Sequence, residues 1–200
     1  MKTPQNKNTT NGFTLVELLV VITIIAILAA AGFAGGNAAL NKAKKVSSQA
    51  GAVSITTAVE QFYAEYSALP DPGTNDKDVD LDSTGDGVGL LEILAAIEDS
   101  TSDDVQNPRK IRFLNNKEGK RDRGGIIYSS NGDAVLGMYD SWGGAFYIWM
   151  DYNYDDRLDF TTKQTGTAVK LNGKKCAVYS LGVDVDEPSS ATVSTLVKSW

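Results

Sequence analysis

The side chains best suited to chemistry in this chain are carboxylates. The 200 residues include 25 Asp and Glu, 19 Lys and Arg, one cysteine and no histidine, and the formal charge is −6. Without histidine, the usual pairs of nucleophile and base are missing, and no phosphate-binding or dinucleotide fingerprint is present. An acidic chain also lacks the basic surface that nucleic-acid binding requires. The composition therefore argues against an enzyme and against a nucleic-acid partner.

One group of carboxylates has the spacing of a calcium-binding loop. Residues 151–159 follow the pattern D-x-N-x-D-x-x-x-D, as in the first part of an EF-hand-type loop, but the loop glycine and the final glutamate are missing. Calcium takes roughly six to eight oxygen ligands, so such a loop can supply several of them. The candidate ligands are Asp151, Asn153, Asp155 and Asp159. An acidic run over residues 78–86 is another candidate, and a solvated acidic loop is the alternative for both.

The N-terminal part of the chain is a long apolar run that contains one acid, Glu17. A helix over residues 13–33 would be about 30 Å long, which is the thickness of the hydrocarbon layer of a membrane. Thirteen of these residues are Leu, Ile, Val or Phe, and together they favour insertion by roughly 4 to 8 kcal/mol. The segment is therefore predicted to span a membrane. Lys2 and Lys7 place its N-terminus in the cytoplasm by the positive-inside rule.

The spacing of apolar residues after this segment predicts that the helix continues, and that a sheet follows it. Between residues 39 and 66 apolar residues recur every three or four positions, as in an amphipathic helix, and Pro70 ends it. A short helix is predicted over 89–98, and strands near 126–128, 134–138, 145–151 and 176–180, with Asn131-Gly132 as a hairpin turn. Residues 71–87 and 99–125 are predicted loops. Cys176 lies in the last predicted strand, where core packing is its expected role.

The spacing of Gly12, Phe13 and Glu17 resembles the N-terminus of type IV pilins and type II secretion pseudopilins. The resemblance implies that a prepilin peptidase cuts between Gly12 and Phe13, that Phe13 becomes N-methylated, and that Glu17 pairs with the N-terminal amine of a neighbouring subunit. An ordinary secretory signal cut near Ala31, or a plain membrane anchor, would also use an apolar run. Neither alternative requires these three residues at this spacing.

The resemblance also predicts the fold and the domain boundaries. It implies an α+β, pilin-like fold, in which a long N-terminal helix with a membrane half and an amphipathic half packs against a small antiparallel sheet. The expected parts are a leader peptide over 1–12, a transmembrane and filament-core helix over 13–36, and a periplasmic domain over 37–200.

Two segments in the second half of the chain resemble major pseudopilins of the type II secretion system more closely. Residues 139–147, Y-D-S-W-G-G-A-F-Y, are similar to the D-P-W-G-N-P-Y segment of that family, with departures at Ser141 and Gly144. Residues 179–184, Y-S-L-G-V-D, are similar to its Y-S-L-G-A-D segment. Because major pseudopilins bind calcium there, the resemblance implies a calcium site with ligands from Asp184, Asp186, Ser180 and Leu181.

Together these features predict a structural protein of the bacterial inner membrane. The expected function is that of a pseudopilus subunit that crosses the membrane once, has a periplasmic C-terminal domain and polymerises to drive protein export. Its expected partners are other copies of itself in a helical filament, the prepilin peptidase, the inner-membrane platform of the secretion system, the minor pseudopilins and the membrane. The alternatives are a type IV pilin for adhesion, motility or DNA uptake, and a membrane-anchored calcium-dependent binding module.

Overall fold

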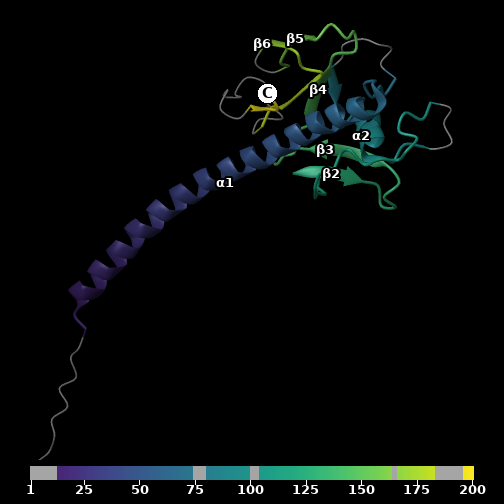
Figure 1. The fold of residues 1–200 in the computed structure, drawn as a ribbon. Helices are drawn as coiled ribbons and strands as arrows, with labels where there is room; N and C mark the ends of the chain where they lie inside the picture. The colour runs from purple at the N-terminus through teal and green to yellow at the C-terminus, as the bar shows by residue number, and fades with distance from the viewer. Residues whose placement is uncertain (1–12, 74–79, 100–103, 164–165, 183–195) are drawn as a thin grey trace, which may run out of the picture. The chain divides into compact units, whose positions relative to one another are not determined.

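The computed structural model describes residues 13–73, 80–99, 104–163, 166–182 and 196–200, without the side chains of residues 31–35. The chain divides into two compact units, residues 1–42 and residues 43–200, which are described separately below. The first helix, α1 (Leu15–Tyr66), begins in the first unit and ends in the second (Figure 1).

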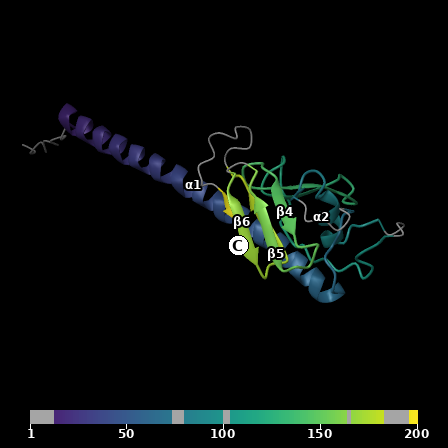
Figure 2. The same cartoon turned by 90° about the horizontal axis from the view of Figure 1, so that it is seen from above.

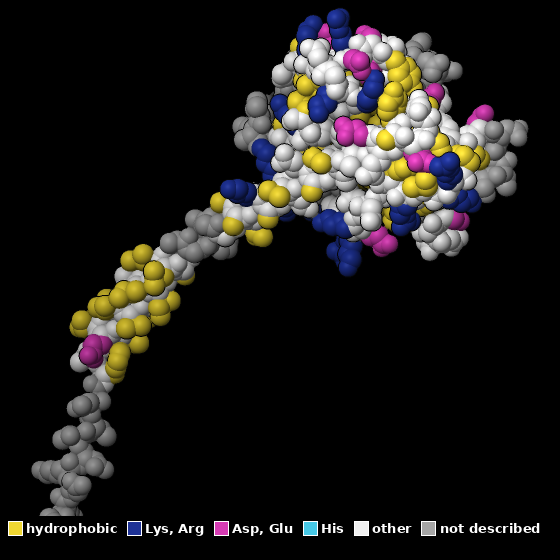
Figure 3. Space-filling model, viewed as in Figure 1, with side chains coloured by type: hydrophobic (Ala, Val, Ile, Leu, Met, Phe, Trp, Pro, Cys, Tyr) yellow, Lys and Arg dark blue, Asp and Glu magenta, His cyan; other side chains and the backbone are white. Residues whose placement is uncertain are grey.

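In the first unit, α1 carries apolar side chains all round. Every large apolar side chain from Phe13 to Leu28 is exposed, by 44% at Val21 and by 80% at Leu15, and these side chains cover the N-terminal part of the helix in Figure 3. Within the described residues, no helix has both the length and the mean hydropathy that a membrane crossing requires. The predicted domain boundaries at residues 12 and 36 stay predictions.

In the second unit, one face of α1 is buried in the main core. Ile55, Val59 and Phe62 are at most 1% exposed, as the amphipathic pattern predicts for this part of the helix. The earlier positions of the pattern face outward instead, since Val46 is 59% exposed and Val53 is 43% exposed. The pattern positions Ala39, Ala43, Val46, Ala50 and Val53 are all exposed and do not contribute to the core of the second unit, whereas Ala52 beside them is buried in it.

A four-stranded antiparallel sheet packs against α1. Its strand order is β1 (Asp80–Asp82), β4 (Phe146–Met150), β7 (Cys176–Ser180) and β8 (Val197–Lys198). Alternate side chains of β4 point to opposite faces, as in any strand, so Phe146 and Ile148 join the core with α1 while Trp149 faces a second core. Cys176 is buried in the main core, which confirms its predicted packing role. The α+β architecture of a long helix and a small antiparallel sheet is confirmed.

Two hairpins complete the second unit, on opposite sides of it in Figure 1. The hairpin of β5 (Arg157–Thr161) and β6 (Ala168–Asn172) covers the outer face of the sheet beside β4, through Leu158, Phe160 and Val169 (Figure 2). The hairpin of β2 (Gly125–Tyr128) and β3 (Val135–Tyr139) has the predicted turn at Asn131-Gly132 and packs against α2 (Val88–Ala95).

The sequence-based prediction missed four strands. β1 lies within the predicted loop 71–87, and β5, β6 and β8 were not predicted. β1 is joined to the rest of the fold by Ser83, whose backbone N–H donates to the carbonyl of Phe146 and whose hydroxyl donates to the carbonyl of Met138. Since these partners lie more than 50 residues away in the chain, local spacing does not reveal the strand.

Candidate functional site

The described part of the N-terminal motif contains a reciprocal contact between Thr14 and Glu17. The Oε2 atom of Glu17 accepts hydrogen bonds from the backbone N–H of Thr14 (2.9 Å) and from its hydroxyl (2.8 Å). In return, the backbone N–H of Glu17 donates to the hydroxyl oxygen of Thr14 (3.2 Å). This arrangement is a capping box, which satisfies N–H groups that have no partner within the helix. It also places an acid at the positive end of the helix dipole.

The capping box holds the Glu17 carboxylate next to the start of the mature chain that the motif implies. The carboxylate accepts from the amide of Thr14, and Thr14 follows Phe13 directly. Gly12, the other half of the predicted cleavage site, lies outside the described residues. The T-x-x-E spacing is a local signal from which the cap could have been predicted.

The two segments that resemble major pseudopilins meet at Asp140. One carboxylate oxygen of Asp140 accepts from three consecutive backbone N–H groups, those of Trp142, Gly143 and Gly144, each at 2.8 Å. The other accepts from the hydroxyl of Ser180 at the end of β7. Both side chains are buried, so neutral donors compensate the burial of the carboxylate. A buried hydrogen-bond network therefore connects segment 139–147 to segment 179–184 through Asp140 and Ser180.

Ser141 connects the turn after Asp140 to α1. Its backbone N–H donates to the hydroxyl of Ser48 at 2.9 Å, and the hydroxyl of Ser48 donates to the carbonyl of Lys44 at 2.9 Å. The family that this segment resembles has proline at the position of Ser141, and proline has no N–H to donate. The departure from the family pattern therefore adds a hydrogen bond between the turn and the helix.

The acidic loop 151–159 is paired with a cation from outside it, the ammonium of Lys175. Asp151 is 0% exposed, and its carboxylate accepts from the backbone N–H groups of Asp155 and Asp156, both at 3.1 Å. The ammonium of Lys175 lies 3.5 Å from Asp151 and 2.7 Å from Asp156. The hydrogen bond to Asp156 raises the pKa of Lys175 above its usual value. A buried carboxylate with a cation and two amide donors needs no further partner.

The candidate calcium ligands of this loop accept hydrogen bonds from backbone amides or pair with lysines, and the oxygens of Asp151 and Asn153 both accept from the N–H of Asp155. Asn153 accepts from the amide of Asp155, and Asp155 accepts from the amide of Arg157. Asp159 lies on β5 and forms an ion pair with Lys170 of β6 at 2.7 Å. Among the residues that the structure describes, no three acidic, histidine or cysteine side chains are grouped as metal ligands would be. Calcium binding by Asp151, Asn153, Asp155 and Asp159 stays a prediction.

The other predicted ligands are only partly described. Asp184 and Asp186 lie outside the described residues. Ser180 is bonded to Asp140, and Leu181 packs against the second core. These predicted calcium ligands stay predictions.

The acidic run 78–86 is built into a turn and an ion pair where it is described. Residue 78 lies outside the described residues. Asp80 pairs with Lys163 at 3.1 Å, while burial raises the pKa of Asp80. Asp82 accepts from the backbone N–H and the hydroxyl of Thr84, and Asp86 accepts from the backbone N–H of Asp82.

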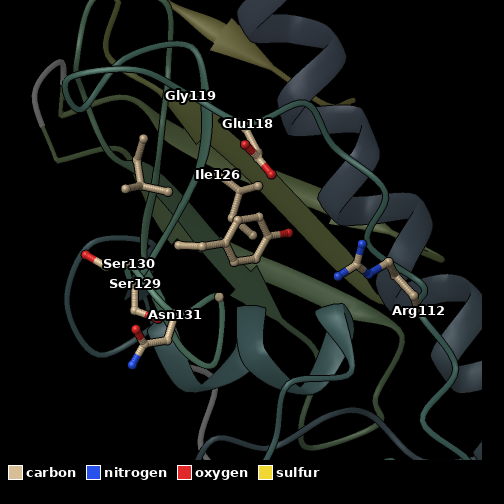
Figure 4. A pocket seen from close by; sticks show the side chains of 10 residues that line it. Arg112, Glu118, Gly119, Ile126, Ser129, Ser130 and Asn131 are labelled. Atoms are coloured by element: carbon tan, nitrogen blue, oxygen red, sulfur yellow. The ribbon is translucent and has the colours of Figure 1, made fainter.

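A surface hollow of about 540 Å³ lies over β2. Figure 4 shows Arg112 at one side of it and Ser129, Ser130 and Asn131 at the other. Arg112 donates to the carbonyl of Ala95. The hydroxyl of Ser129 donates to the carboxylate of Asp133 within the hairpin turn, and we assign no chemistry to the hollow.

Comparison with known proteins identifies the N-terminal segment. Residues 7–33 match the family model of the prokaryotic N-terminal methylation motif. Nothing among curated proteins or solved structures matched the chain. The motif supports a type IV pilin-like or pseudopilin protein and points to a structural protein rather than an enzyme. It implies processing by a prepilin peptidase and assembly into a pilus-like filament. The chain therefore carries the prepilin cleavage and methylation motif of type IV pilins and pseudopilins.

Proposed function

We propose that this protein is a structural subunit of a type II secretion pseudopilus. The observation that carries the proposal is the prokaryotic N-terminal methylation motif over residues 7–33. The choice of a pseudopilus rather than a surface pilus rests on segments 139–147 and 179–184, which resemble major pseudopilins and are joined by the hydrogen bond between Asp140 and Ser180.

In this proposal the peptidase cuts after Gly12 in the inner membrane, and the C-terminal unit lies in the periplasm. The mature chain is held by its apolar segment until it joins the filament on the inner-membrane platform, together with minor pseudopilins. Exposed apolar residues of α1 support the burial of this helix against other subunits. They extend into the second unit at Val46 and Val53, and an apolar helix face of this kind is typical of an interaction surface.

The experiment is deletion of the gene in its own bacterium, with secretion and surface pili measured in the same cultures. A pseudopilus subunit should leave secreted proteins trapped in the periplasm, while surface pili, motility and DNA uptake stay normal. Loss of surface pili with normal secretion would instead support a type IV pilin. The wild-type gene should restore secretion to the deletion strain.

We further propose that calcium binds the C-terminal region through Asp184 and Asp186, with oxygens from Ser180 and Leu181. The support is the resemblance of residues 179–184 to a calcium-binding segment and the absence of any intrachain disulfide in a chain with one cysteine. An ion that binds only the folded state adds roughly 2.7 kcal/mol to the free energy of unfolding when its concentration is about 100 times its dissociation constant.

The calcium proposal is tested by the thermal midpoint of the mature protein in detergent, with calcium and with chelator. Calcium should raise the midpoint of the wild type and of Asp155→Ala, but not that of Asp184→Ala. No response in the wild type would exclude the site. A response that Asp155→Ala abolishes and Asp184→Ala retains would move the ion to residues 151–159. Calcium-dependent capture of another protein without any filament would favour the membrane-anchored binding module.

A further inference from the structure

A group of exposed basic side chains lies beside α1 in the second unit. They belong to residues 117–123, which we call the basic tip and which contain Lys117, Lys120, Arg121 and Arg123, all exposed. The tip is placed against the helix by the ammonium of Lys117, which donates to the hydroxyl of Ser47 at 3.2 Å. Lys44 and Lys45 lie one turn before Ser48 on the same helix, and Lys44 is exposed.

The basic tip is held in one conformation by its backbone. The N–H of Lys120 donates to the carbonyl of Arg123 at 3.0 Å, and the N–H of Gly119 donates to the carbonyl of Ile126 at 2.8 Å. Arg121 and Asp122 at its apex have φ angles of 52° and 55°, a left-handed conformation that residues other than glycine rarely adopt. The N–H of Gly124, which follows the basic tip, donates to the carbonyl of Asp140. The charges are therefore presented by a fixed turn.

The charge of the basic tip is opposite to that of the rest of the protein. With Lys44 and Lys45, and after subtraction of Glu118 and Asp122, the group carries a formal charge of +4. Loss of Lys2 and Lys7 with the leader changes the formal charge of the chain from −6 to −8. The remainder of the mature chain therefore carries −12, the difference between −8 and +4.

We propose that the basic tip, with Lys44 and Lys45, contacts exposed carboxylates of a neighbouring copy in the filament. The inference rests on the proposed function only in that it requires a filament. Subunits with a net charge of −8 repel one another. Contact of the +4 group with a neighbouring copy, whose remaining residues carry a net −12, is attractive and favours one relative orientation. The two surfaces differ, so the contact is heterologous and can repeat without closing, as an open helical filament requires.

An anionic lipid surface is the other partner that could attract these cations. The neighbouring copy is favoured because its complementary charge is a property of this same chain, and because the motif implies that copies assemble. A contact of this kind must weaken with salt, since screening acts strongly on exposed charges.

The test compares two charge-reversal variants of the full-length chain, overproduced in its own bacterium. One is Lys120→Glu with Arg121→Glu, at the apex of the basic tip. The matched control is Lys110→Glu with Lys174→Glu, which makes the same change in net charge at exposed sites elsewhere. The measurements are filament yield, the thermal midpoint of the mature protein, its binding to phosphatidylglycerol vesicles, and release of subunits from filaments between about 0.05 M and 0.5 M salt.

The apex variant should lower filament yield at least about tenfold, which corresponds to about 1.4 kcal/mol. Its thermal midpoint should be unchanged, and the control should assemble as the wild type does. Wild-type filaments should release subunits faster as salt rises.

Normal assembly of the apex variant would overturn the inference while leaving the proposed function intact. An equal loss in the control would show that net charge, rather than the basic tip, matters. Normal filaments combined with lost binding to phosphatidylglycerol vesicles would assign the surface to lipid instead. A wild type that forms no filament at all would refute the proposed function itself.

Discussion

The two units of this chain place their large apolar side chains differently: the first exposes them and the second buries most of them. In the first unit, Phe13 is 71% exposed and Leu28 is 66% exposed, whereas in the second Phe62 and Ile148 are almost completely buried. Apolar surface that the chain leaves exposed must be covered by lipid or by other molecules. The first unit is thus specialised for contacts outside the chain, and the second for a stable fold of its own.

The polar groups show the same contrast. Among the described residues, Glu17 in the first unit makes exposed hydrogen bonds with Thr14. In the second unit, Asp140 and Asp151 are buried, and each is compensated by partners within the unit. Changes in the first unit should therefore affect assembly without affecting stability, and changes at these two aspartates should affect stability first.

The largest effect is expected from Glu17→Ala, which should abolish filaments while the thermal midpoint of the C-terminal unit stays the same. The reason is the predicted pair between Glu17 and the N-terminal amine of a neighbouring subunit. In an apolar filament core, loss of one member of such a pair leaves the other charge uncompensated. Filament yield and the thermal midpoint are measured on the same preparation.

Thr14→Ala is the control that separates assembly from helix capping. It removes the Thr14 hydroxyl, which donates to the Glu17 carboxylate and accepts from the Glu17 amide, but leaves the Glu17 carboxylate and its bond from the backbone N–H of residue 14 in place. Filaments should still form in this variant. If both variants lose filaments equally, the capping box rather than a pair between subunits explains the role of Glu17.

Asp140→Ala should give the largest loss of stability in the second unit, about 3 to 5 kcal/mol in the free energy of unfolding. The variant leaves three backbone N–H groups and the hydroxyl of Ser180 without their acceptor. Asp140→Asn keeps one acceptor oxygen and should lose clearly less. Chemical denaturation measures both, and equal losses in the two variants would contradict a role based on hydrogen bonding.

Lys175→Met should lower the free energy of unfolding by about 1 to 3 kcal/mol. The loss is smaller than for a fully buried pair because two amides still bind Asp151 and Lys175 is partly exposed. Lys174→Met, one residue away and exposed, should stay within about 0.5 kcal/mol of the wild type. Equal stability of Lys175→Met and the wild type would show that Asp151 does not depend on this cation.

The sequence predicted the parts of the fold that depend on local spacing. The buried face of α1 around Ile55 and Phe62, the short helix α2 and the hairpin at Asn131-Gly132 all follow from periodicity and turn residues. β5 was missed although Leu158 and Phe160 alternate with polar residues. Its first residues overlap the acidic pattern 151–159, which predicts a loop there instead of a strand.

The candidate sites were predictable to different degrees. Gly12, Phe13 and Glu17 lie within a short motif, so the sequence alone reveals them. The pairing of Asp151 with Lys175 and the bond between Asp140 and Ser180 join residues far apart in the chain. Such contacts depend on the pairing of β4 with β7, for which the local sequence contains no direct signal.

The most direct test of the account is mass spectrometry of the N-terminus of the mature protein. The chain should begin at Phe13, and its amine should carry one methyl group, as the motif over residues 7–33 implies. A mature chain that retains Lys2, or one that begins at Gly32 after cleavage by an ordinary signal peptidase, would contradict the assignment to the pilin and pseudopilin class.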